Sequence, residues 1–577
     1  MSGLEIVPLA IQSFQLCIQA YQFFYTVGHM DQEVDLVRSR LQWEQYRLVE
    51  WGQRAGLNKT PDNRLNWSVA CGLLEQQHAL LTSADKLKRL YNLQVQEEEE
   101  LVHPKNVSVA SELDFPDSGI GKLVAKLRPD IYTTSAAQSV RIGGKAFRRL
   151  RWATIGRKQA DRVIQDIAEQ NTRLWQLLDS AEQLSLRNGV DALLRDIISR
   201  SNSTSEVETV QQLLNPGQAI SDKALAAAAS LKQIRLTIGV DKTDDEIPPQ
   251  LTRLVKEKMP VLKRLKARKV KAKTLVGIET GKYDGEDVVI EWKVVDKPVW
   301  KDFRQQVEAL AVLLTALQDS SFHALSCIGY LPWEEKERYA IVYELPPTMM
   351  EGPSTGLKSL YEVLGEEPKV SLYQRVQIAL DLSETLLQLH TAGWLHKGIR
   401  SENVRFTIPE KAKTGSLLES PMYLVGYEYS RPDTTGAALM TELPDTNPYA
   451  DLYRHPQARG NHRMRFHKRF DVYALGCVLL ELALWKRIVD VQSEFTSHDL
   501  GAAILKAEID KKDVDLPDFL KFGSDPDQVL HVRHSAGKVF TDAIIACFSP
   551  EGGSGDASES YLGTQKAVVD KLRSCRC

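Results

Sequence analysis

The stretch that decides the fold is Gly393-Trp-Leu-His-Lys-Gly-Ile-Arg-Ser-Glu-Asn-Val-Arg-Phe406, a polar loop between apolar residues. The segment before it, from Ser371 to His390, has small or apolar residues at helical spacing. These residues are Leu372, Val376, Ala379, Ser383 and Leu386. The spacing predicts a long helix that ends shortly before the loop. A histidine, a glycine and an asparagine at positions 396, 398 and 403 therefore follow a predicted helix directly.

The loop resembles the catalytic loop of protein kinases, whose pattern is His-Arg-Asp-Leu-x-x-x-Asn. In that family the Asp orients the attacking hydroxyl and accepts its proton, and the Asn holds a magnesium ion. The matching positions here are His396, Lys397, Gly398 and Asn403. Because glycine has no side chain, Gly398 cannot act as the base.

A candidate nucleotide lysine stands about 100 residues before this loop. The β-branched and aromatic run Val288-Val-Ile-Glu-Trp-Lys293 resembles the third strand of a kinase N-lobe. The resemblance places Lys293 on the nucleotide phosphates and pairs it with Glu308 of a helix predicted over 300–317. Three glycines, Gly277, Gly281 and Gly285, precede the strand at a spacing that supports a phosphate cradle only weakly.

Three further blocks follow the loop in the order found in kinases. Gly426-Tyr-Glu428 stands where a metal-binding Asp-Phe-Gly is expected, so glycine again replaces an aspartate. Gln457 replaces the acid that closes the activation segment. The run from Asp471 to Gly476 resembles the buried helix whose aspartate holds the catalytic-loop backbone, so Asp471 and His396 are expected to be structural anchors.

The resemblance implies a pseudokinase over residues 271–577, with an N-lobe over 271–346 and a C-lobe over 347–577. Loss of the base and of a principal metal ligand should remove most of the rate enhancement, so no catalytic residue is expected. ATP binding without catalysis, through Lys293 and Asn403, stays open. Magnesium would depend on Asn403 and is doubtful.

The first part of the chain is predicted to be an all-helical bundle. Residues 6–25 are apolar around most of a helix, with glutamines at 12, 15, 19 and 22 on one stripe. Two interpretations stay open: a helix buried in the bundle, or an end segment that enters a membrane interface, although it lacks a basic polar face.

This part resembles the fungal HeLo domain over residues 1–205. The resemblance rests on Gly3-Leu-Glu-Ile-Val-Pro-Leu-Ala10, on the pair Arg40-Leu-Gln-Trp43 and Leu48-Val-Glu-Trp-Gly52, and on Arg149-Leu-Arg-Trp152 before a long helix. HeLo domains occur in proteins of heterokaryon incompatibility and prion-triggered programmed cell death, where the N-terminal segment is implicated in membrane insertion. The resemblance implies membrane lipids as partners of this domain.

Residues 206–270 are expected to form a helical and basic brace between the two domains. The stretch 253–273 is rich in Lys and Arg, which favours a solvated brace or attraction to a membrane. It lacks the interleaved aromatic residues of a nucleic-acid surface, so no nucleic acid is expected as a partner.

Composition agrees with a cytoplasmic multidomain protein. The chain has 577 residues, a net charge of -3 and seven scattered cysteines, which read as reduced thiols. Neither a secretory signal nor a transmembrane helix is expected. The terminal Cys575-Arg-Cys577 resembles a prenylated end over too few residues to decide lipidation.

The expected fold class is multidomain: an all-α HeLo-like bundle followed by an α+β bilobal kinase-like fold. The domain order resembles that of mixed-lineage kinase domain-like proteins. It predicts a non-catalytic effector of cell death or incompatibility, cytoplasmic and recruited to the plasma membrane, whose kinase-like half binds a protein partner or self-associates. The alternatives are a divergent active ATP-dependent kinase and a scaffolding protein.

Overall fold

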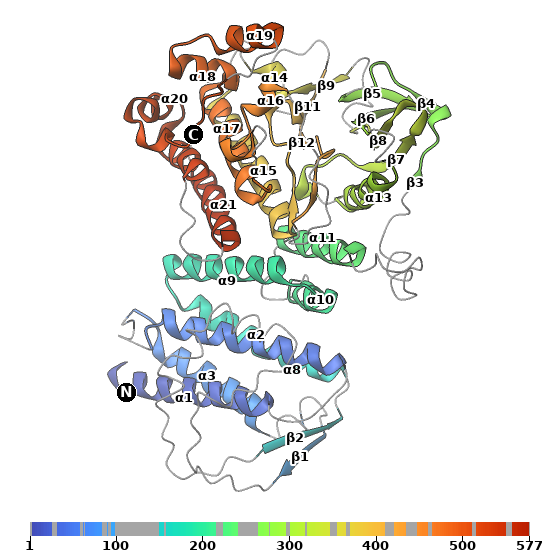
Figure 1. Cartoon of the computed structure of the whole chain (residues 1–577). Helices are drawn as coiled ribbons and strands as arrows, with labels where there is room; N and C mark the ends of the chain where they lie inside the picture. Colours follow the sequence, from blue (N-terminus) through green and yellow to red (C-terminus); the bar gives the residue numbers. More distant parts are fainter. Residues whose placement is uncertain are drawn as a thin grey trace. The chain divides into compact units, whose positions relative to one another are not determined.

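The structure is a computed structural model of the chain (Figure 1). It describes residues 3–25, 32–57, 62, 64–83, 89, 94–98, 149–154, 157–214, 223–239, 263–275, 277–295, 300–317, 320–346, 355–364, 370–409, 421–433, 447–459, 464–510, 515–549 and 557–575. Two compact units are present, Met1–Ala226 and Ala227–Cys577, called the first and the second unit below.

The first unit is mainly a helical bundle. Its elements are α1 (Gly3–Tyr25), α2 (Gln32–Arg54), α3 (Trp67–Thr82), β1 (Gln94–Glu98), β2 (Arg149–Thr154), α8 (Arg157–Gln176), α9 (Ser180–Arg200) and α10 (Thr204–Leu213). Residues Val207, Val210 and Leu213 of α10 are buried, so α10 adds to the core of this unit. The unit therefore extends beyond residue 205, the predicted boundary of the helical domain.

The first helix is packed into the bundle rather than set apart from it. Phe14 and Cys17 are buried, and the Cys17 thiol donates to the Leu74 carbonyl at 3.1 Å. A methyl group at Gly52 would lie 2.5 Å from the Phe14 ring, so only glycine at this point of α2 admits the ring. Leu9 keeps 44% of its surface exposed. No helix in the described part of the chain is long and apolar enough to cross a membrane.

Residues 149–154 form a strand, which the sequence did not predict. β2 pairs antiparallel with β1, and Glu98 lies opposite Arg149 in the register. Arg149-Leu-Arg-Trp152 therefore belongs to a two-stranded ribbon, and the long helix α8 begins at Arg157.

The second unit begins with α11 (Lys223–Gly239), which crosses the boundary, and continues with an N-lobe sheet of six strands in the order β3-β7-β8-β6-β5-β4. Its elements are β3 (Lys263–Arg264), β4 (Val270–Lys271), β5 (Ile278–Tyr283), β6 (Glu286–Val294), α13 (Trp300–Ala316), β7 (Cys327–Trp333) and β8 (Arg338–Glu344). All pairs except β3–β7 are antiparallel. The predicted brace residues 253–262 lie outside the described residues.

The C-lobe is mostly helical. Its elements are β9 (Thr355–Ser359), α14 (Leu360–Val363), α15 (Leu372–Thr391), β10 (Trp394–Leu395), β11 (Val404–Pro409), β12 (Met422–Leu424), β13 (Arg431–Pro432), α16 (Pro448–Asp451), α17 (Lys468–Leu484), α18 (Ile488–Thr496), α19 (Leu500–Asp510), α20 (Pro526–Phe548) and α21 (Ala557–Ser574). Among them α17 is buried along almost its whole length, which makes it the centre of the lobe (Figure 1). Cys575 packs half-buried against the core, and Cys577 lies outside the described residues.

The predicted fold class is confirmed. The N-terminal part is helical, and the C-terminal part combines an antiparallel sheet with a helical lobe (Figure 1). Helix α15 delivers the loop 393–406 as the spacing of its apolar residues predicts, with a capping box formed by Ser371 and Gln374 at its start.

Candidate functional site

The loop 393–406 is held by its backbone. The Asp471 carboxylate accepts hydrogen bonds from the backbone N–H groups of His396 at 2.9 Å and Lys397 at 2.8 Å. His390 Nε2 lies 3.1 Å from the same carboxylate, and Gln565 of α21 lies 2.7 Å from the other ring nitrogen. A buried chain of polar groups therefore runs from the last helix through α17 to the loop.

The histidine of the loop has a structural environment. His396 is fully buried, and its Nδ1 accepts a hydrogen bond from the Gly398 N–H at 3.2 Å. Burial lowers the pKa of His396 to about 4, although the Asp471 carboxylate opposes this shift. Its ring lies 4.5 Å from that of Tyr427. The side chain is therefore neutral near pH 7 and turned into the core.

Gly398, Asn403 and Gly426 are brought together at the centre of the site. The Asn403 amide donates to the Gly398 carbonyl at 2.7 Å. A Cβ at Gly398 would lie 2.7 Å from the Gly426 carbonyl oxygen, and one at Gly426 would lie 2.1 Å from Asn403 Nδ2. Gly426 also has a φ of +84°, which disfavours any side chain. The two positions therefore lack both the carboxylates and the space for them.

Lys293 and Glu308 contact different partners. Lys293 Nζ donates to the backbone carbonyl of Glu428 at 2.6 Å and lies 5.3 Å from the Tyr429 ring centre. Glu308 accepts from Arg304 at 2.8 Å and from Tyr330 at 2.5 Å.

The face of α13 beside Lys293 explains this arrangement. It presents Val307 and Leu310, which line a cavity together with Lys293. Glu308 lies on another face of the same helix, where it meets strand β7 through Tyr330. The structure thus shows apolar side chains, and no carboxylate of α13, at the described cavity next to this lysine.

The loop between β4 and β5 is held by hydrogen bonds to the carboxylate of Glu279, which lies at the start of β5. Glu279 accepts hydrogen bonds from the backbone N–H groups of Lys273, Thr274 and Leu275 at 2.8–2.9 Å. It also accepts from the Trp292 indole at 2.7 Å. Burial alone would raise the pKa of Glu279, but these four hydrogen bonds together hold it below its usual value.

These N–H groups face away from the lysine. Glu279 lies opposite Ile290 in the register, and Ile290 and Trp292 belong to one apolar cluster. Side chains alternate across a strand, so Glu291 and Lys293 lie on the other face. Backbone N–H groups that could cradle a phosphate are therefore occupied on the face of the sheet opposite to Lys293.

The cavity beside Lys293 is small. It is lined by Glu291, Val307, Leu310 and Glu428 among others, and its volume is about 10 Å³. A space of this size holds about one water molecule, whereas pockets for drug-sized ligands measure about 300–1,000 Å³. In the described residues, no group of three or more His, Cys, Asp or Glu side chains is arranged to hold a metal ion.

The predicted end of the activation segment lacks the acid that kinases have there, and other contacts hold it in place. Gln457 is exposed, and its backbone carbonyl accepts from Met464 at 2.8 Å. The buried carboxyl group of Glu481 binds the Tyr453 hydroxyl at 2.7 Å and the Ser401 hydroxyl at 3.2 Å. Burial raises the pKa of Glu481 well above its usual value. This carboxyl group connects α17 to both the loop 393–406 and the activation segment.

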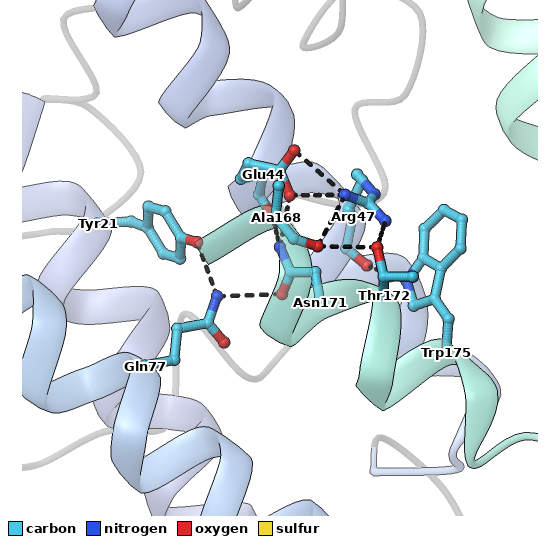
Figure 2. A network of polar contacts seen from close by, with 8 residues as sticks. All are labelled: Tyr21, Glu44, Arg47, Gln77, Ala168, Asn171, Thr172 and Trp175. Atoms are coloured by element: carbon cyan, nitrogen blue, oxygen red, sulfur yellow. Dashed lines mark hydrogen bonds and ion pairs between the residues drawn. The ribbon is translucent and has the colours of Figure 1, made fainter. Parts of the chain in front are cut away.

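The first unit has a buried polar network of its own, made of Tyr21, Glu44, Arg47, Gln77, Asn171 and Thr172 and called the bundle network below (Figure 2). Arg47 and Glu44 form a salt bridge of 2.9 Å, and Arg47 also donates to the Thr172 hydroxyl at 3.0 Å. The guanidinium lies 4.4 Å from the centre of the Trp175 ring. The charges of this network are therefore paired inside the bundle.

The bundle network also connects α1 to the other helices. The Gln77 amide donates to the Tyr21 hydroxyl at 2.8 Å and to Asn171 at 3.0 Å, and Asn171 donates to Glu44 at 2.8 Å (Figure 2). Four helices, α1, α2, α3 and α8, thus contribute to one hydrogen-bonded chain. Release of α1 from the bundle would break the bond at Tyr21.

Two carboxylates of the second unit were not singled out from the sequence. Glu291 lies in the strand used to place Lys293, and Glu279 lies in the strand that carries Gly281. An acidic residue two positions before a lysine, inside an otherwise apolar strand, is a signal that could have identified Glu291, because both side chains lie on one face. The bonds of Glu279 depend on how the loop folds back, and no sequence spacing indicates them.

Comparisons with known proteins agree with both halves of the prediction. Residues 6–213 match the HeLo family, described as prion-inhibition and propagation. The C-terminal region is similar to three Arabidopsis thaliana proteins. A probable LRR receptor-like serine/threonine-protein kinase is 25% identical over 33% of this chain and 19% of its own length. A probable receptor-like protein kinase is 27% identical over 33% and 20% of the two chains.

The third relative, a serine/threonine-protein kinase-like protein, is 27% identical over 29% of this chain and 41% of its own. The chain thus covers about a fifth of the first two relatives and about two fifths of the third. The predicted order of a HeLo domain followed by a kinase-like region is confirmed.

Proposed function

From the premise that the chain joins an N-terminal HeLo domain to a C-terminal kinase-like region, we propose that it is a non-catalytic signalling effector. The kinase-like unit senses a signal or a partner without transferring phosphate. It thereby restrains or releases a HeLo domain that perturbs membranes, in the cell-death or incompatibility responses associated with that family.

The observation that carries the proposal is the packing of Gly398, Asn403 and Gly426. Phosphoryl transfer depends on a positioned acceptor and on metal ions that neutralise charge. At the two positions where a kinase carries those aspartates, this chain has glycines whose missing side chains are replaced by Asn403 and by backbone. The space of the two aspartates is thus filled by other atoms of the chain.

The surroundings of Lys293 support a cleft that works without ATP. The lysine is bound to a backbone carbonyl, and the cavity next to it holds about 10 Å³. The N–H groups of the loop 273–275 are taken by Glu279. We therefore propose that the cleft is not a nucleotide site in this conformation.

The first helix supports a membrane role for the first unit. It exposes Pro8 and Leu9 while Phe14 and Tyr21 hold it in the bundle. A helix that packs in the bundle through one face and exposes apolar residues elsewhere can have two states, packed or released. A partner that binds these states unequally would shift the balance.

Leakage of dye from anionic lipid vesicles tests the proposal. Residues 1–226 are expected to cause leakage, and the full chain is expected to cause less. Leu9→Glu on α1 should reduce leakage, whereas Val69→Glu, a similarly exposed residue of α3, should not. An inert fragment, or equal effects of the two substitutions, would contradict the membrane role. A stable protein complex recovered with an inert fragment would favour a scaffold instead.

A divergent kinase is the second candidate, because Lys293 and the Asp471 anchor are both present. Labelled ATP with magnesium or manganese distinguishes it. The effector predicts no transfer to the chain or to a general substrate protein. Transfer that is lost in Lys293→Ala and kept in Lys282→Ala, an exposed lysine of β5, would establish the kinase and overturn the proposal.

A further inference from the structure

Glu291 places a carboxyl group inside the cleft. The residue lies on β6 with 2% of its surface exposed. Its Oε2 accepts hydrogen bonds from the Tyr343 hydroxyl at 3.0 Å and from the Gly426 N–H at 3.3 Å. The second of these bonds joins the N-lobe sheet to the segment that follows β12. Its Oε1 is buried and has no hydrogen-bond partner among the described residues.

A second carboxyl group faces it from the other lobe. Glu428 lines the same cavity as Glu291 and Lys293. Its Oε2 is also buried without a hydrogen-bond partner in the described part of the chain, while its backbone carbonyl binds Lys293. Two carboxyl groups, each with one buried oxygen that has no hydrogen-bond partner among the described residues, thus lie at one small cavity.

A single proton satisfies both oxygens. Two carboxylates that share a site cannot both ionise at low cost, because like charges repel and burial penalises each of them. A carboxylic acid can donate the hydrogen bond that a neighbouring carboxylate accepts. We propose that Glu291 and Glu428 share one proton and so form a clasp that joins the N-lobe to the C-lobe across the cleft.

The other groups around the pair agree with one negative charge. Lys293 lies at the same cavity, and Tyr343 donates to Glu291 from β8. Tyr427 and Cys327 are buried nearby, and burial raises the pKa of both. His396 is neutral near pH 7 because of its burial, and the positive charge of Arg405 acts on Glu291 from a distance.

The direction in which the pKa of Glu291 is shifted follows from the position of this residue in the cleft. Burial first, and the adjacent Glu428 second, raise it well above its usual value of 4.5. A carboxyl group whose pKa is raised by folding stabilises the fold most when it is protonated. The contribution of the clasp should therefore be complete at acidic pH and should fall as the pH rises from about 4.5 toward the raised pKa of Glu291.

A matched pair of variants of the full chain tests the clasp. In Glu291→Gln the amide group can always donate a hydrogen bond, as the protonated carboxyl group does. Glu335→Gln is the control, because it alters an exposed carboxylate of the same lobe. The melting temperature of the unit that responds to Glu291→Gln is followed from pH 5 to pH 9. The wild type and Glu335→Gln should lose several degrees over this range, and Glu291→Gln should lose less and melt higher at pH 9. Parallel profiles for all three proteins would overturn the clasp.

Infrared spectroscopy in heavy water at neutral pH observes the proton directly. Protonated carboxyl groups have a C=O band separate from that of carboxylates, and the buried Glu481 also contributes to it. Glu291→Gln should remove part of this band, and Glu335→Gln should leave it unchanged. A difference spectrum that loses only carboxylate absorption would show that Glu291 is ionised and would contradict the proposal. Neither readout depends on whether the first unit perturbs membranes.

Discussion

The two units bury polar groups in opposite ways. In the bundle network, Arg47 and Glu44 have opposite charges, Arg47 also donates to Thr172, and Asn171 donates to Glu44. In the cleft, Glu291 and Glu428 are both acidic, and each has one buried oxygen without a hydrogen-bond partner among the described residues. The comparison teaches that the first arrangement holds helices together, whereas the second is typical of a place where protonation or a partner matters.

The largest expected loss of stability follows from a substitution in the bundle network. Glu44→Ala leaves the Arg47 guanidinium, which is 1% exposed, without its counter-charge. Loss of one partner from a buried pair costs about 3–5 kcal/mol. Urea unfolding should show this loss in the transition of the first unit.

The control for this variant is Glu169→Ala, which removes an exposed ion pair with Arg173 on α8. Such a pair is worth about 0–1 kcal/mol. Equal losses in the two variants would show that the bundle network is no stronger than a surface pair.

Restoring an aspartate in the cleft should harm the second unit. Gly426→Asp places a side chain at a φ of +84° and against Asn403. The strain and overpacking should together cost about 2–4 kcal/mol in thermal unfolding and bring no phosphoryl transfer. Gly563→Asp on α21, where a Cβ meets nothing within 4 Å, is the control. A Gly426→Asp protein that is stable and transfers phosphate would refute the closed site.

Removing the loop anchor should have a smaller effect. Asp471→Asn replaces a carboxylate that accepts from two backbone N–H groups and His390, and hydrogen bonds to charged groups are worth about 1.5–3 kcal/mol. Amide hydrogen exchange in the loop 393–406 should accelerate. Asp542→Asn, at an exposed pair with Arg533, should leave that exchange unchanged. Unchanged exchange in Asp471→Asn would mean that the loop is held by other contacts.

Substitution of Glu279 should have the smallest effect on stability, and its pH dependence should be opposite to that of Glu291. Because hydrogen bonds lower its pKa in the fold, its contribution is present above about pH 4.5 and is lost as the pH falls through the lowered pKa. Glu279→Gln should cost about 1–2 kcal/mol at pH 7 and less near pH 3. Glu286→Gln, at an exposed position of β6, is the control. A loss that grows on acidification would contradict this assignment.

Much of the fold could be predicted from the sequence, because helical periodicity indicates the helices and the order of the motifs indicates the kinase-like arrangement. The helix before the loop follows from the spacing of its apolar residues, whereas Lys293 and the glycines at 398 and 426 are placed by their resemblance to kinase motifs. The strand β2 did not follow, because its partner β1 lies about 50 residues earlier. Short strands take their stability from such distant pairing.

The details of the cleft depend on contacts that no spacing encodes. The face of α13 that meets Lys293 is set by packing, which turns Glu308 toward Tyr330. The carboxyl groups of Glu279, Glu291 and Glu481 acquire their roles from burial and from partners far away in the chain. Resemblance to a family also directs attention to the positions that the family uses, and these three are not among them.

The most direct test of the closed cleft is a thermal-shift titration of the full chain with ATP, with and without magnesium. A ligand that binds only the folded state must raise the melting temperature, because it stabilises that state by RT ln(1 + c/Kd), where c is the concentration of free ligand. The closed cleft predicts no shift at millimolar ATP under either condition. A magnesium-dependent shift that grows with the ATP concentration, disappears in Lys293→Ala and persists in Lys282→Ala would contradict it.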